Sequence, residues 1–120
     1  SPSKAARVLQ EYVGNKDREH VVALHLDTRN RLIGIETVAI GTLTDANVSP
    51  REFYKSAVLL NSAGVVAGHN HPSGDVSPSA IDRAMHVRLR DAGEILGVPL
   101  LDFLIVSRGR YWAASERASA

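Results

Sequence analysis

Two histidines, a serine and an aspartate stand close together in the middle of the chain. The segment GHNHPSGDVSPSAID places His69 and His71 two residues apart, and Ser79 and Asp82 three residues apart. Alternate residues of a β-strand point to the same side, so both imidazoles share a side if the chain is extended there. Residues three apart on a helix share a face, which places Ser79 beside Asp82. Two imidazoles and one carboxylate form a common catalytic zinc site, with the fourth position left for water.

Each part of this pattern also has an ordinary structural interpretation. Histidines two apart are common on surfaces, and the sequence Pro-Ser-Gly-Asp is typical of turns. Ser79 and Asp82 would also serve as a helix cap without any metal. The combination, directly after a buried strand, favours a metal site over these separate interpretations. The ligand set also suits iron or manganese, although a tetrahedral His-His-Asp site favours Zn²⁺.

Helix and strand signals on both sides of this segment predict a single α/β domain over residues 1–120, with one sheet flanked by helices. A helix is expected over residues 1–14, where Pro2 suits the first turn and Gly14 the exit. Residues 69–78 are expected to form a loop, and Ser77 or Ser79 caps the helix that follows. The other predicted elements are helices over 49–61 and from the cap to 96, and strands over 21–26, 32–43, 64–68, 98–106 and 111–113.

The composition excludes several classes of protein. Fourteen Lys and Arg oppose thirteen Asp and Glu, a net charge of +1, and this balance gives no support for binding nucleic acid or a membrane surface. The absence of cysteine excludes disulfide scaffolds, thiolate zinc sites and cysteine nucleophiles. No apolar run approaches the roughly 20 residues of a membrane span, and no signal peptide is visible. We therefore expect a cytoplasmic domain, and the sequence leaves its oligomeric state open.

The spacing His69-x-His71, Ser79 and Asp82 matches the JAMM motif of the JAB1/MPN metalloprotease superfamily, and the variant HNHPSG followed by PS and D resembles the RadC family. The resemblance covers essentially the whole chain, including the strings LHLDTRNRLIG, ETVAIGTL, SPREFYKSA and LGVPLLDFLIV. It implies a cytidine-deaminase-like (JAB/MPN) fold, a three-layer α/β arrangement that holds zinc. It also implies hydrolysis of a peptide or isopeptide bond in active relatives.

The resemblance implies a role for each motif residue. His69, His71 and Asp82 would hold Zn²⁺, and the hydroxyl of Ser79 would help to stabilise the oxyanion. The motif also requires a glutamate from an earlier strand, and Glu36 is predicted to fill that place as the general base.

The residues around Glu36 agree with a functional role. Its strand face also carries Val38 and Ile40, and an unpaired carboxylate among apolar neighbours is costly. The alternative is an edge strand from which Glu36 points into solvent.

Two functions remain open at this point. The first is a zinc-dependent hydrolase acting on a protein or peptide substrate. The second is a non-catalytic interaction module associated with DNA-repair or DNA-processing complexes, with a structural or vestigial metal site. A complete three-residue ligand set with a nearby base favours the enzyme, because structural zinc sites fill all four positions with protein ligands. Many RadC relatives carry an N-terminal region that resembles helix–hairpin–helix modules, and these 120 residues do not include it.

The chain departs from the usual RadC pattern at three positions. Phe103 stands where histidine is usual, His86 where threonine is common, and Ala113 where serine is common. Because Asp82 and His86 are four apart on a helix, we expect His86 to orient Asp82 by a hydrogen bond without binding the metal.

Overall fold

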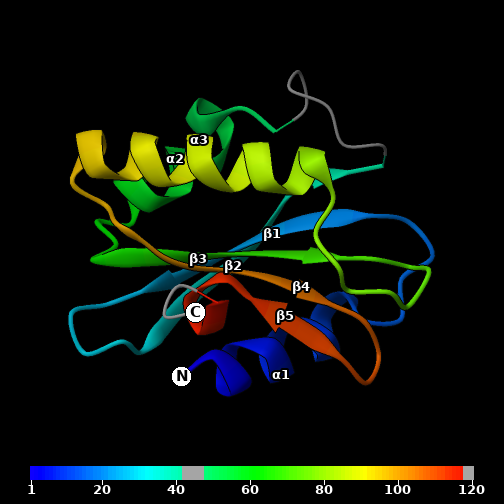
Figure 1. Cartoon of the computed structure of the whole chain (residues 1–120). Helices are drawn as coiled ribbons and strands as arrows, with labels where there is room; N and C mark the ends of the chain where they lie inside the picture. The colour runs from blue at the N-terminus through cyan, green and yellow to red at the C-terminus, as the bar shows by residue number, and fades with distance from the viewer. Residues whose placement is uncertain (42–47, 118–120) are drawn as a thin grey trace.

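The computed structural model describes residues 1–41 and 48–117, which form a mixed five-stranded sheet with helices on both faces (Figure 1). The strand order is β2-β1-β3-β4-β5. The elements are α1 (Pro2–Val13), β1 (His20–Leu26), β2 (Leu32–Ile40), α2 (Pro50–Leu59), β3 (Gly64–Asn70), α3 (Ala80–Leu96), β4 (Leu100–Val106), β5 (Tyr111–Ala113) and α4 (Ala114–Arg117). The predicted α/β architecture is confirmed. The predicted end of the second strand, at Leu43, lies outside the described residues.

The sheet pairs the beginning of β1 with the end of β3. β1 lies antiparallel to both β2 and β3, and in this register Val21 is opposite both Ala39 and His69. β3 and β4 are parallel, and the crossover between them contains α3. The chain entering β1, the chain leaving β3 and the first turn of α3 therefore meet at one edge of the fold.

Apolar side chains bury both faces of the sheet. On one face, α2 and α3 pack through Phe53, Tyr54, Met85 and Leu89. On the other face, α1 packs through Ala6, Leu9 and Val13, and Figure 1 shows this helix on the side of the sheet opposite α2 and α3. All seven residues of β3 are buried, which confirms the predicted central strand over 64–68 and extends it through His69 and Asn70, which were expected to lie in the loop.

α1 packs unusually close to β3 at Gly68. A Cβ atom placed on Gly68 would lie 2.3 Å from a methyl carbon of Leu9. Real Cβ atoms do not approach other carbons so closely, so an alanine here would require the Leu9 side chain or α1 to shift.

Local sequence signals account for the ends of α3. The Ser79 side chain accepts a hydrogen bond from the Asp82 backbone N–H, and the Asp82 side chain accepts one from the Ser79 backbone N–H. This capping box begins the helix, and Gly97, at φ 77°, ends it in a left-handed conformation that favours glycine.

None of the helices among the described residues is long and apolar enough to cross a membrane.

Candidate metal centre

His69 and His71 are held so that the same ring atom of each, Nε2, points toward Asp82. β3 remains extended through Asn70, and the Nδ1 atom of His69 lies 3.1 Å from the carbonyl oxygen of His20. The Nδ1 atom of His71 lies 2.7 Å from the carbonyl oxygen of Asp75. A carbonyl oxygen can only accept, so each Nδ1 carries a proton, and a ring without a second proton presents a lone pair at Nε2. This is the orientation that metal-binding histidines adopt.

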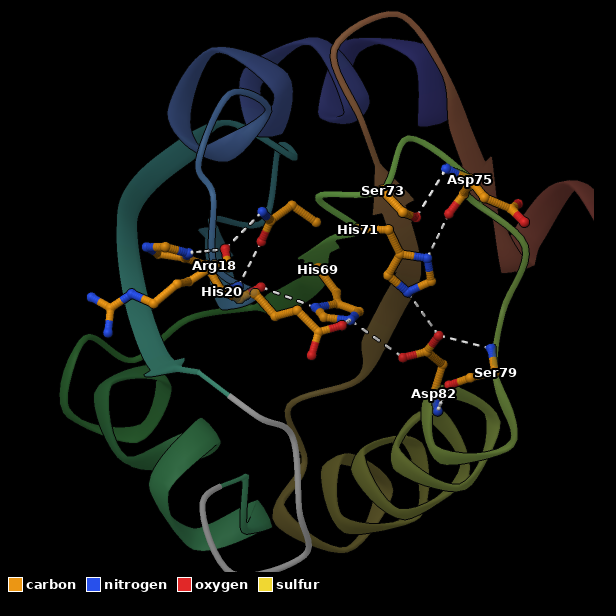
Figure 2. Close-up of polar contacts among 10 residues, drawn as sticks. Arg18, His20, His69, His71, Ser73, Asp75, Ser79 and Asp82 are labelled. Atoms are coloured by element: carbon orange, nitrogen blue, oxygen red, sulfur yellow. Dashed lines mark hydrogen bonds and ion pairs between the residues drawn. The ribbon is translucent and has the colours of Figure 1, made fainter.

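Asp82 lies opposite both Nε2 atoms, as Figure 2 shows. Its Oδ1 is 3.4 Å from Nε2 of His69, and its Oδ2 is 3.0 Å from Nε2 of His71. Lone pairs of neutral imidazoles repel a carboxylate unless a cation or a proton lies between them. Ligand atoms 2.0–2.1 Å from a tetrahedral zinc ion are about 3.3 Å apart. The observed spacings therefore fit a zinc ion held by these three residues.

The burial of His69 strengthens this interpretation. Its side chain is 1% exposed, and its Nε2 atom forms no hydrogen bond with the residues that the structure describes. Burial lowers the pKa of His69 below its usual value, since the charged form loses its hydration. A buried nitrogen atom without a partner is costly, and a metal ion would satisfy it.

Glu19 also lies in this group, although the sequence interpretation missed it. Its Oε1 atom is 3.5 Å from Nε2 of His69. One ligand atom each from Glu19, His69 and His71 lie within 4.8 Å of one another, so these three side chains form a group that could hold a metal ion. Glu19 directly precedes β1, and the antiparallel pairing of β1 with β3 brings it to the histidines. The sequence does show an acidic residue just before that strand. Its nearness to the histidines follows only from the pairing of β1 with β3.

No ion pair or hydrogen bond joins Glu36 to His69 or His71 among the described residues, and its predicted role as general base stays a prediction. Glu36 pairs with Ala23, two residues along β1 from the position opposite His69. Its Oε2 atom accepts a hydrogen bond of 2.7 Å from the Ser56 hydroxyl on α2, and its Oε1 lies 4.0 Å from Nε2 of His25. The side chain is 40% exposed, so the carboxylate is neither isolated in the core nor free in solvent.

Ser79 stands beside the candidate site as the sequence predicts. Its hydroxyl oxygen accepts the backbone N–H of Asp82 at 3.1 Å. Its backbone N–H donates to Oδ2 of Asp82 at 2.8 Å, so Ser79 orients the carboxylate (Figure 2). The hydroxyl hydrogen is not used in either bond.

His86 does not orient Asp82, contrary to the expectation from its helical spacing. Within residues 1–41 and 48–117, His86 forms no hydrogen bond with Asp82 and instead stacks on Phe103, with ring centroids 5.2 Å apart and planes at 24°. Burial lowers the pKa of His86, so it remains neutral at pH 7. Two of the three departures from the usual RadC pattern are therefore in contact with each other, and the third, Ala113, is buried in the core.

An open groove adjoins the histidines. It has a volume of about 1170 Å³ and is lined by residues 14–17, 71–75 and 107–110. His71 forms part of its wall, and Asp75, which fixes the His71 ring through its carbonyl oxygen, forms another part. The pKa of the Asp75 carboxyl is lowered because the carboxylate accepts the Ser77 backbone N–H. Of the residues around the candidate metal centre, only His71 lines this groove.

Comparison with known proteins agrees with the geometry. Residues 1–119 match the model of the RadC-like JAB domain. A UPF0758 protein of Shouchella clausii is 46% identical over 117 residues, covering 98% of this chain and 51% of the relative. UPF0758 proteins of Desulforudis audaxviator and Rubrobacter xylanophilus are 41% and 42% identical, covering 92% and 97% of this chain and 48% and 51% of the relatives. The chain thus spans about half the length of the curated relatives it matches.

Proposed function

Because the chain belongs to the family of RadC-like JAB domains, we propose that it is a zinc-dependent hydrolase of peptide or isopeptide bonds. One observation carries the proposal: two imidazoles, each fixed through Nδ1 by a backbone carbonyl, direct their Nε2 atoms toward the two oxygens of one carboxylate. His69, His71 and Asp82 would hold the zinc ion in this proposal, which leaves a position for water.

Glu19 takes the role that the sequence interpretation gave to Glu36. Zn²⁺, when bound, supplies a Lewis acid and lowers the pKa of a water molecule to about 7. The carboxylate of Glu19 accepts a proton from the attacking water and later gives it to the leaving nitrogen. Water adds to the carbonyl carbon and the C–N bond breaks, so the products are one carboxylate and one amine. Glu19 is 36% exposed, which leaves its carboxylate accessible to both water and substrate.

Ser79 assists at the carbonyl oxygen in this proposal. Because its hydroxyl oxygen accepts from the Asp82 backbone, the hydroxyl hydrogen remains available to a substrate oxygen. A hydrogen bond that strengthens as negative charge develops on that oxygen lowers the barrier. The groove beside His71 would hold the polypeptide that carries the bond.

The test compares the same substitution, glutamate to glutamine, at two positions, Glu19 and Glu36. Glu19→Gln should keep about one zinc per chain, lose hydrolysis, and retain bound substrate, whose class mass spectrometry of captured material would identify. Glu36→Gln should keep zinc and cleave that substrate at the wild-type rate. Loss of hydrolysis in Glu36→Gln but not in Glu19→Gln would contradict the assignment.

A further outcome separates the enzyme from an interaction module. If Glu19→Gln and the wild type capture the same proteins, and neither form releases a cleaved product, the domain binds partners without hydrolysing them. That result would favour a non-catalytic module over the hydrolase.

A further inference from the structure

Asn70, the residue between the two histidines, is buried, and both polar atoms of its side chain are used. Its Oδ1 accepts the backbone N–H of His20 at 2.6 Å. Its Nδ2 donates to the backbone carbonyl of Arg18 at 3.0 Å. Only 1% of Asn70 is exposed. Both bonds therefore join the end of β3 to the backbone on either side of Glu19.

The backbone around Glu19 is held from both neighbouring strands. His69 Nδ1 donates to the carbonyl oxygen of His20, so two consecutive residues of β3 bind this short segment. From the other side, the Gly41 backbone N–H donates to the carbonyl oxygen of Glu19 at 2.8 Å. Figure 2 shows Arg18 and His20 next to His69, with the bond from His69 to the His20 carbonyl oxygen drawn.

We propose that Asn70 is a positioning residue that fixes the Glu19 carboxylate beside the histidine pair, His69 and His71. The proposal rests on the proposed function, in which Glu19 moves the proton. Regular pairing of β1 with β3 ends at His69, opposite Val21, and Glu19 precedes that point. The Asn70 amide continues the attachment there, because it offers one acceptor and one donor as a peptide group does.

Other side chains of similar size would not meet this requirement. Leucine fills the same volume without polar atoms and would leave a buried N–H and C=O unpaired, which is costly. An ionised aspartate has two acceptors, one of which would oppose the Arg18 carbonyl oxygen. The amide therefore accounts for an asparagine between the histidines, a position whose side chain is not a ligand.

The experiment measures the metal environment as well as activity. Co²⁺ replaces Zn²⁺ in the wild type, Asn70→Ala, Glu19→Gln and the double variant, and the visible absorption spectrum of each is recorded. Tyr54→Phe is the matched control, since it removes a buried hydrogen bond, from Tyr54 to the Leu89 carbonyl, on the helical layer. Hydrogen exchange of the His20 amide reports directly on its bond to Asn70.

We expect Asn70→Ala to bind metal stoichiometrically, to exchange the His20 amide faster, and to change the Co²⁺ spectrum as Glu19→Gln does. Hydrolysis should fall about 10–100-fold, the usual effect of losing a group that orients a metal site. In the Glu19→Gln background Asn70→Ala should have no further spectral effect, because a residue that acts through Glu19 has nothing left to position. Tyr54→Phe should leave the spectrum unchanged.

Two results would overturn the inference while leaving the proposed function intact. One is a wild-type Co²⁺ spectrum in Asn70→Ala when Glu19→Gln alters it. The other is an equal spectral change from Asn70→Ala with and without the Glu19 carboxylate. An unaltered spectrum in Glu19→Gln itself would instead contradict the place of Glu19 in the site, and the inference would fall with it.

Discussion

The same face of the sheet carries two groups that each combine histidine, glutamate and serine, and only one has the geometry of a metal centre. In the first, two Nε2 lone pairs meet Asp82, with Glu19 3.5 Å from one of them. In the second, a single buried histidine, His25, lies 4.0 Å from Glu36, whose other oxygen is bound by Ser56.

The difference lies in how the rings are oriented and how many ligands converge. In the metal centre a carbonyl oxygen fixes each Nδ1, so each Nε2 has a defined direction. In the second group neither ring nitrogen of His25 has a hydrogen-bond partner among the described residues. A histidine beside a glutamate is thus not sufficient for a metal site; hydrogen bonds that fix the ring and a third ligand are also needed.

Loss of metal is the largest effect that separates the two groups. Asp82→Ala should abolish stoichiometric zinc binding, because it removes the carboxylate that faces both histidines. Asp75→Ala is the matched control, since the His71 ring bonds to the backbone of Asp75 and not to its side chain. Metal analysis after gel filtration measures both. Equal losses of zinc from the two variants would show that Asp82 is not a ligand.

The two serines provide the next contrast. Ser79→Ala should keep zinc and slow hydrolysis by about 10²–10³-fold, the effect of removing one oxyanion donor in a characterised hydrolase. Ser56→Ala, in the second group, should leave the rate of hydrolysis unchanged. Steady-state kinetics on a substrate found with the Glu19→Gln trap would measure both rates, and similar losses in the two variants would contradict the distinction.

Much of this arrangement could be predicted from the sequence because its signals are local. The capping residues Ser79 and Asp82, the apolar strand 64–68 and the alternation of His69 and His71 depend only on neighbours along the chain. The choice between Glu19 and Glu36 depends instead on which strand pairs with β3 and in what register. The prediction of Glu36 came from the family resemblance, supported by its apolar strand neighbours, and neither signal concerns Glu19.

The role of His86 was mispredicted for a related reason. Helical spacing places His86 on the same face as Asp82, and that spacing cannot show that Phe103 lies closer in space. The His86 ring stacks on Phe103. Asp82 already accepts a hydrogen bond from the Ser79 backbone N–H. Competing partners from distant parts of the chain decide such contacts.

A smaller effect is expected on stability from the second group. Ser56→Ala removes a hydrogen bond of 2.7 Å to Glu36 that joins α2 to β2. Because the Glu36 side chain is 40% exposed, water replaces part of this bond, and we expect a loss of about 1 kcal/mol in the free energy of unfolding. Urea denaturation of the metal-free protein measures it, with no change expected in its slope. Unchanged stability would mean that this contact is not a link between the two elements.

The smallest expected effect is a pH dependence of stability that originates at His25. Burial lowers the pKa of His25 in the folded protein, while the nearby Glu36 carboxylate opposes this shift only in part. The unfolded chain therefore binds more protons, and stability falls as the pH drops below about 6.5, the pKa of an unfolded histidine. In metal-free protein, His25→Gln should lose less stability than the wild type between about pH 7 and pH 5. Parallel pH profiles of the two proteins would remove His25 from this explanation.

Anomalous diffraction at the zinc absorption edge, from crystals of the zinc-loaded protein, tests the central claim most directly. The account predicts one strong peak about 2.0–2.1 Å from Nε2 of His69, Nε2 of His71 and an oxygen of Asp82, with the Glu19 carboxylate beside the fourth position. A peak between His25 and Glu36, or no peak near His69 and His71 in zinc-loaded crystals, would contradict it.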